Sequence, residues 1–122
     1  MDPTIVNREI ILAAECPAIH RKVILYKQTW EEHILPARPD LKHRLGLVRE
    51  IIEKSSPGVM IYQKIDNPDR ISFQKESQHF LPYNKYLRIA LKLLSNSKTA
   101  IVTTVVPVNK LPTIGVKKYE RK

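Results

Sequence analysis

The hydrophobic period of the chain changes once, from 3.6 residues to 2, after the turn-forming segment at residues 55–58. Before that segment, apolar residues recur at the spacing of one helix face, at Leu41, Leu45, Val48 and Ile52. After it, apolar and polar residues alternate, as they do in strands that are buried on one face only. Because the helical pattern precedes the strand pattern, the sequence predicts an α+β fold with helices packed on a sheet.

Two helices are predicted before the change of period. The first begins at Thr29, which is a suitable N-cap, and Glu32 completes a capping box with it. It ends or kinks at Pro36, because a residue that precedes proline avoids the α region. The second helix begins at Asp40, another N-cap residue, and ends at the turn before the strands. Residues 1–20 fit either a short helix or a strand, so we expect only a short N-terminal element there.

The strands are predicted to form a roughly four-stranded antiparallel sheet, over residues 59–63, 70–74, 86–93 and 99–106. The last of them is apolar on both faces, which favours a central position. A further short strand, at residues 22–26, precedes the first helix. The length favours a single domain, residues 1–110, followed by a basic C-terminal tail, residues 111–122, which we expect to be loose or to form a basic arm.

The positive charge is concentrated in the second half of the chain. Residues 1–69 contain ten Lys/Arg and ten Asp/Glu, whereas residues 70–122 contain eleven Lys/Arg and two Glu. The whole net charge of +9 therefore belongs to the part that is predicted to form the sheet. Such asymmetry favours a polyanionic partner such as RNA, although a solubilising surface with a basic tail has the same composition.

Other classes of site are disfavoured by what the sequence lacks. The single cysteine, Cys16, excludes an internal disulfide, fits a reducing cytoplasmic compartment and is expected to be a small buried hydrophobe. The histidines lack metal-ligand spacing, and no glycine-rich nucleotide loop occurs, so neither a metal nor a cofactor is expected. No apolar run approaches the roughly 20 residues of a membrane span, so no membrane association is expected.

The chemistry that remains is metal-free cleavage of RNA, in which the 2′-hydroxyl attacks the adjacent phosphorus. That reaction needs an acid, a base and cations, which His, Arg, Lys, Tyr and Ser/Thr side chains can supply. His33 is the candidate acid or base. The other catalytic candidates are Arg38, Arg88, Thr103 and Thr104. The candidates for binding nucleic acid are Arg44, Arg70, Lys85, Lys92 and Lys110.

Each catalytic candidate also has a purely structural interpretation. His33 shares a helix face with core residues and could be a half-buried packing histidine. Arg38 could pair with a neighbouring acid, and Arg88 could belong to a solvated sheet face. Of Thr103 and Thr104, strict alternation would turn one toward the core and the other toward the polar face.

Three segments of the chain resemble the phage-associated branch of the barnase–EndoU–colicin–RelE group of ribonucleases. They are KVILYKQTWEEHILPARPDL, VREIIEKSSPGVMIYQKIDNPDRISF and KYLRIALKLLSNSKTAIVTTVVP. The resemblance implies a metal-independent endoribonuclease, toxin-like, with a neutralising antitoxin or immunity protein as partner. It places His33, Arg38, Arg88 and Thr103 or Thr104 in the site. Arg38 stands where many members have a histidine.

Two other classes of function stay open. A non-catalytic nucleic-acid-binding module needs only the basic half of the chain. A protein-interaction or assembly module, for which a sheet edge could serve as the dimer contact, needs neither catalysis nor RNA.

Overall fold

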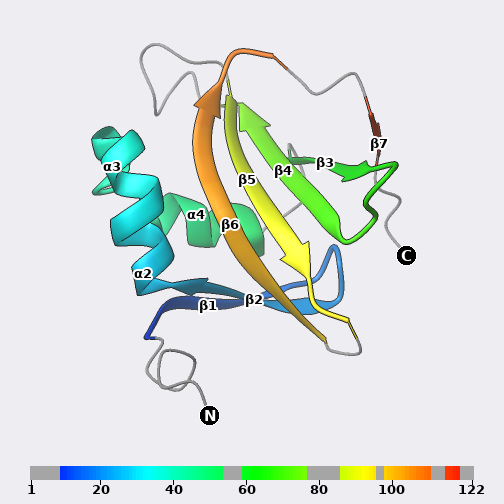
Figure 1. Cartoon of the computed structure of the whole chain (residues 1–122), viewed down its shortest axis with the longest axis horizontal. Coiled ribbons are helices and arrows are strands. Elements are labelled where there is room, and N and C mark those ends of the chain that lie inside the picture. The colour runs from blue at the N-terminus through cyan, green and yellow to red at the C-terminus, as the bar shows by residue number, and fades with distance from the viewer. Residues whose placement is uncertain (1–8, 54–58, 77–85, 96–97, 111–114, 119–122) are drawn as a thin grey trace.

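The structure is a computed structural model, and it describes residues 9–53, 59–76, 86–95, 98–110 and 115–118. It confirms the α+β class, because the helical segments follow two strands and precede the rest of one mixed sheet (Figure 1). Within the described residues the sheet has seven strands in the order β1-β2-β6-β5-β4-β3-β7. The strands are β1 (Ile10–Cys16), β2 (Arg21–Tyr26), β3 (Val59–Lys64), β4 (Arg70–Glu76), β5 (Tyr86–Leu93), β6 (Thr99–Val108) and β7 (Val116–Lys118).

The predicted four-stranded antiparallel sheet is therefore too small, although its meander is present. β3, β4, β5 and β6 pair antiparallel in chain order, and β6 is central, as its apolar character predicted. The additional strands join at both sides of this meander. β1 and β2 form an antiparallel hairpin, and β2 pairs parallel with β6. At the other side β7 pairs with β3, so three residues of the predicted tail belong to the sheet.

The parallel seam between β2 and β6 is held by Arg21. Its guanidinium Nη1 donates to the carbonyl oxygens of Leu94 and Thr99, each at 3.2 Å. The backbone N–H of Lys22 donates to the carbonyl of Lys98 at 2.9 Å. These bonds attach the N-terminal hairpin to the β5–β6 hairpin, over a separation in sequence that no local pattern could reveal.

The first helical segment begins earlier than predicted and continues past Pro36. It runs through α2 (Lys27–Thr29), a π-helical turn η1 (Trp30–Ile34) and α3 (Leu35–Ala37). Thr29 is already helical and its side chain makes no capping hydrogen bond, so it is not the N-cap. Pro36 lies inside the segment, where the wider π turn gives its ring room that an α-helical turn lacks. The helix ends instead at Arg38, which precedes Pro39 and has φ −140°.

The second helix begins later than predicted. Pro39–Leu41 forms a 3₁₀ turn, η2, and the α-helix α4 runs over Leu45–Glu53, so Asp40 is not its N-cap. The predicted apolar stripe is present nevertheless, because Leu41, Val48 and Ile52 are fully buried. The 3₁₀ turn thus replaces the first predicted helical turn without changing which side chains reach the core.

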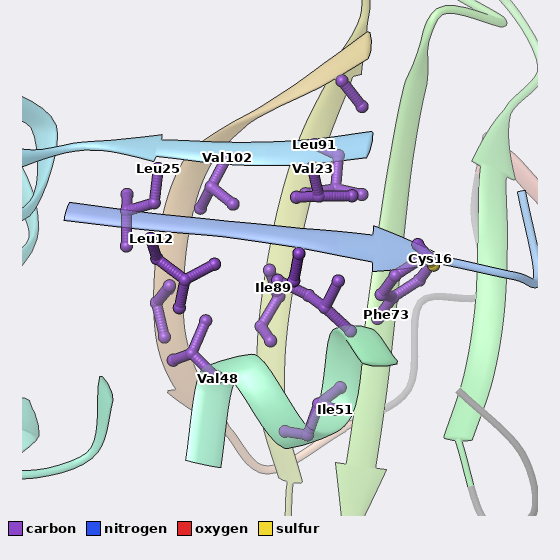
Figure 2. Packing of buried hydrophobic residues seen from close by; sticks show 14 of the residues in the cluster. Leu12, Cys16, Val23, Leu25, Val48, Ile51, Phe73, Ile89, Leu91 and Val102 are labelled. Atoms are coloured by element: carbon purple, nitrogen blue, oxygen red, sulfur yellow. The ribbon is translucent and has the colours of Figure 1, made fainter. Parts of the chain in front are cut away.

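The core lies between the meander and the N-terminal part of the chain. Figure 2 shows β1 and β2 running across β4–β6, with α4 beside β1 and the buried side chains between them. Leu12 and Val23 enter from the hairpin, Val48 from α4, and Phe73 and Ile89 from the meander. Cys16 is buried at 1% exposure, as predicted for a small hydrophobe.

The opposite side of the meander forms a second surface, which we call the groove face. The predicted alternation is confirmed in β5, where Leu87, Ile89 and Leu91 are buried in the core. Arg88 and Ala90 lie between them in sequence and therefore project to the other side. Figure 1 is seen from this side, with α4 behind the strands. The candidate nucleic-acid interface lies on the groove face.

Candidate nucleic-acid interface

A groove of about 610 Å³ lies on the groove face, between the strands of the meander and β7. Its charged lining residues are Lys64, Arg70 and Arg88, and no carboxylate is among the described residues that line it. Hydroxyl groups of Tyr62, Ser72, Thr103 and Thr104 add hydrogen-bonding capacity, as does the amide of Asn67. A concave surface with cations, neutral donors and no anions suits a phosphate-bearing ligand.

Arg88 is held in this groove by a buried glutamine. Its Nε donates to Oε1 of Gln74 at 2.8 Å, and Gln74 is its cross-strand partner in β4. The alternation over residues 70–74 places Gln74 on the side of its strand opposite Ile71 and Phe73. It does lie on that side, but its exposure is 0%.

A β-bulge brings both threonines to the groove. Ala90 pairs with Thr104 and Leu91 with Val102, so Thr103 is the extra residue in β6. The bulge shifts the alternation by one residue, which leaves Val102 and Val105 both buried while both threonines line the groove. Strict alternation would have turned one threonine to the core. The Thr103 hydroxyl donates to the carbonyl of Ala90 at 3.2 Å, and Thr104 is exposed.

A second cationic position lies at the other end of the groove. Arg70 pairs across the strands with Lys92, four residues along β5 from Arg88. At about 3.3 Å per residue, the two positions are roughly 13 Å apart along the sheet. Lys64 and Asn67 line the groove beside Arg70, whereas the exposed Lys92 is not a lining residue. The groove thus has cations at two separated points.

The candidates from the helical region do not line the groove. His33 belongs to η1 and is exposed, so it is not the half-buried packing histidine of the structural interpretation. Arg38, at the end of α3, and Arg44, before α4, are partly buried. Neither of these arginines lines the groove, and His33 does not line it either.

Lys110 and Lys85 are the remaining candidates for binding nucleic acid. Lys110 is exposed just beyond β6, and its carbonyl oxygen accepts a hydrogen bond from Nε2 of Gln74 at 3.5 Å. Its side chain is not part of the groove lining. Lys85 lies outside the described residues.

Sequence reasoning did not select several polar residues at this site: the structure places Tyr62, Lys64, Asn67 and Ser72 in the lining of the groove and Gln74 against Arg88. Gln74 carries a polar side chain at an outward position and has no local signal of burial. Tyr62 lies in the predicted strand over residues 59–63 and Lys64 lies one residue beyond it, and no local pattern distinguishes either of them from residues of an ordinary solvated strand. Only the pairing of β3 with β4 brings them beside Arg70 and Ser72.

Two classes of feature do not occur in the part of the chain that the structure describes. No three His, Cys, Asp or Glu side chains gather there in a way that could hold a metal ion. No helix there has the length and apolar character to cross a membrane.

Comparisons of the chain with protein-family models, curated proteins and solved structures find no match, so the groove itself carries the functional argument.

Proposed function

We propose that this protein binds RNA in the groove, as a domain of the metal-independent endoribonuclease type. The observation that carries the proposal is the lining: Lys64, Arg70 and Arg88 with four hydroxyl-bearing side chains and no described carboxylate. Phosphate contacts dominate the affinity of proteins for nucleic acids, and arginine and lysine supply them. The excess positive charge of the second half of the chain extends the same field around the groove.

The dimensions of the groove favour a single strand. Its roughly 13 Å between the two cationic positions accommodates a few nucleotides of one strand rather than a double helix. Tyr62 offers an aromatic ring, and Asn67 and Ser72 offer hydrogen-bonding groups for base edges or ribose hydroxyls. Single-stranded RNA uses all three kinds of group.

Cleavage requires a group that exchanges protons with the ribose and the leaving oxygen. In the proposed reaction the 2′-oxygen bonds to phosphorus, the 5′-oxygen leaves, and a cyclic phosphate remains. Arg88 stabilises the charge on the phosphoryl oxygens, Thr104 orients the phosphate, and His33 exchanges the protons. Support for His33 comes from η1, which packs against β6, the strand that carries both threonines.

The test begins with binding. Fluorescence anisotropy with a short labelled oligouridylate should show binding that weakens with salt, with a slope of about −2 if the three lining cations each contact a phosphate of a single strand. Arg88→Ala should weaken binding by roughly tenfold or more. The matched control is Lys42→Ala, which removes one charge from an exposed position of the helical region and should have little effect. Equal losses in the two variants would overturn the assignment of the groove.

Cleavage is tested separately, on a structured RNA with EDTA present. Loss of cleavage in a folded His33→Ala variant that still binds RNA supports the catalytic role of His33. Binding without any cleavage by the wild type supports the second candidate, a non-catalytic RNA-binding module. The observation that favours this second candidate is that no histidine lines the groove among the described residues. Cytoplasmic location and a neutralising partner protein stay predictions.

A further inference from the structure

Gln74 is the one polar side chain among the described residues that is fully buried. Burying an amide is unfavourable unless its groups form hydrogen bonds. Gln74 lies on the groove face of β4, and its neighbour in sequence, Phe73, fills the core on the opposite face. Gln74 does not line the groove itself, but it holds Arg88, which does, through a hydrogen bond that an apolar residue could not form.

The hydrogen bonds of Gln74 permit only one orientation of its amide. Oε1 accepts from Nε of Arg88 at 2.8 Å, while Nε2 donates toward the carbonyl oxygen of Lys110 at 3.5 Å. A flipped amide would place its NH₂ group against the Arg88 donor and its oxygen against a carbonyl. The strand pairing of Gln74 with Arg88 fixes the two side chains side by side.

This contact determines which edge of Arg88 is available to a ligand. A guanidinium has five N–H donors, and the Nε donor of Arg88 is taken by Gln74. The terminal Nη1 and Nη2 groups are the fork that matches two oxygens of a phosphate. No ion pair of Arg88 with a carboxylate occurs in the described part of the chain, so its charge is not neutralised there.

Arg70 provides an internal contrast. It also lines the groove, but in the described residues its guanidinium has no hydrogen bond comparable to that between Arg88 and Gln74. A long side chain that is not held loses rotamer freedom when it binds a ligand, whereas a held one has already lost it. Arg88 is thus preorganised and Arg70 is not.

We infer that Gln74 is a positioning residue, which holds Arg88 so that its terminal fork binds one RNA phosphate in bidentate fashion. This inference rests on the proposed function and names the point of the groove at which a phosphate is fixed. Lys64 and Arg70 then contribute charge without a fixed geometry.

A double-mutant cycle tests the inference with the same labelled oligouridylate. Gln74→Met keeps the size of the side chain and removes the acceptor for Arg88, and it should weaken binding by about fivefold to tenfold. The salt slope should not change, because no charge is lost. In the Arg88→Lys background, which lacks both Nε and the fork, Gln74→Met should have no further effect.

The cycle separates positioning from a general structural role. A loss of folding would weaken binding equally in both backgrounds, and that result overturns the inference. Should Gln74→Met not fold, Gln74→Glu keeps an acceptor for Arg88 while it adds a negative charge. It should retain a protected Arg88 Nε–H signal in nitrogen-15 NMR spectra and reduce the salt slope by about 0.7. Loss of that signal in Gln74→Glu, or its absence in the wild type, contradicts the inference.

The outcomes also distinguish this inference from the proposed function. If the wild type binds and Arg88→Ala does not, but Gln74→Met binds like the wild type, only the positioning role of Gln74 is wrong. If the wild type does not bind the oligouridylate at low salt, the proposed function fails and the inference fails with it.

Discussion

Phe73 and Gln74 are adjacent in β4, both have 0% exposure, and they lie on opposite faces of the sheet. Phe73 packs in the hydrophobic core with residues of the N-terminal hairpin and α4. Gln74 instead forms hydrogen bonds to Arg88 and Lys110 on the groove face. The same degree of burial therefore has a different physical consequence on each face of the sheet. One face removes apolar surface from water, and the other fixes the geometry of a charged side chain.

The largest expected effect is on the core face. Phe73→Ala should reduce the free energy of unfolding by about 3–5 kcal/mol, because it removes a ring and leaves a cavity. Urea denaturation measures the loss. RNA binding, measured at a temperature where the variant remains folded, should keep the salt slope of the wild type. A changed slope would mean that the two faces are not independent.

Gln74→Met should have a smaller effect on stability. It removes two hydrogen bonds, one of them from a charged donor, and the expected loss is about 1–2 kcal/mol in the same denaturation assay. Its effect on RNA binding should exceed that of Phe73→Ala, so the order of the two variants reverses between the assays. If the order is the same in both, burial of Gln74 serves stability alone.

The bulge in β6 allows a finer comparison on the groove face. Thr103→Val keeps a β-branched side chain and removes the hydrogen bond to Ala90, so a loss of about 0.5–1.5 kcal/mol is expected on unfolding. Thr104→Val is the matched control, since Thr104 is exposed and should change stability by less than about 0.5 kcal/mol. Similar losses in both variants would contradict the bulged register.

The smallest effect on stability is expected for Arg70→Ala, within about 0.5 kcal/mol of the wild type. Arg70→Ala should instead change RNA binding: the magnitude of the slope of binding affinity against salt concentration should fall by about 0.7, because one phosphate contact is lost. Anisotropy titrations at several salt concentrations measure that slope. An unchanged slope would remove Arg70 from the RNA path and confine binding to the end of the groove near Arg88.

Much of the core was accessible to sequence reasoning. The alternation in β5 predicted the buried positions of Leu87, Ile89 and Leu91, and the apolar stripe predicted those of Val48 and Ile52. Both predictions rest on periodicity, which depends only on local backbone geometry. The same reasoning placed Arg70 and Arg88 on the polar side of the sheet, and both line the groove.

The candidate site could be predicted only in part. The helical pattern brought attention to His33 and Arg38, but a π turn and Pro39 set their positions, and neither side chain lines the groove. Gln74 was missed because nothing local marks an outward glutamine as buried. The bulge at Thr103 was missed because an extra residue is visible only when the partner strand is known.

By itself the sequence determined which residues are apolar at which period, and therefore the α+β class, the meander and the location of the positive charge. Tertiary structure decided the parallel pairing of β2 with β6, the addition of β1 and β7, and the shape of the groove. The physical reason is that periodicity is a property of one strand or helix, whereas register and pairing depend on segments far apart in the chain. The contact between Gln74 and Arg88, on which the proposed phosphate site rests, belongs to the second kind.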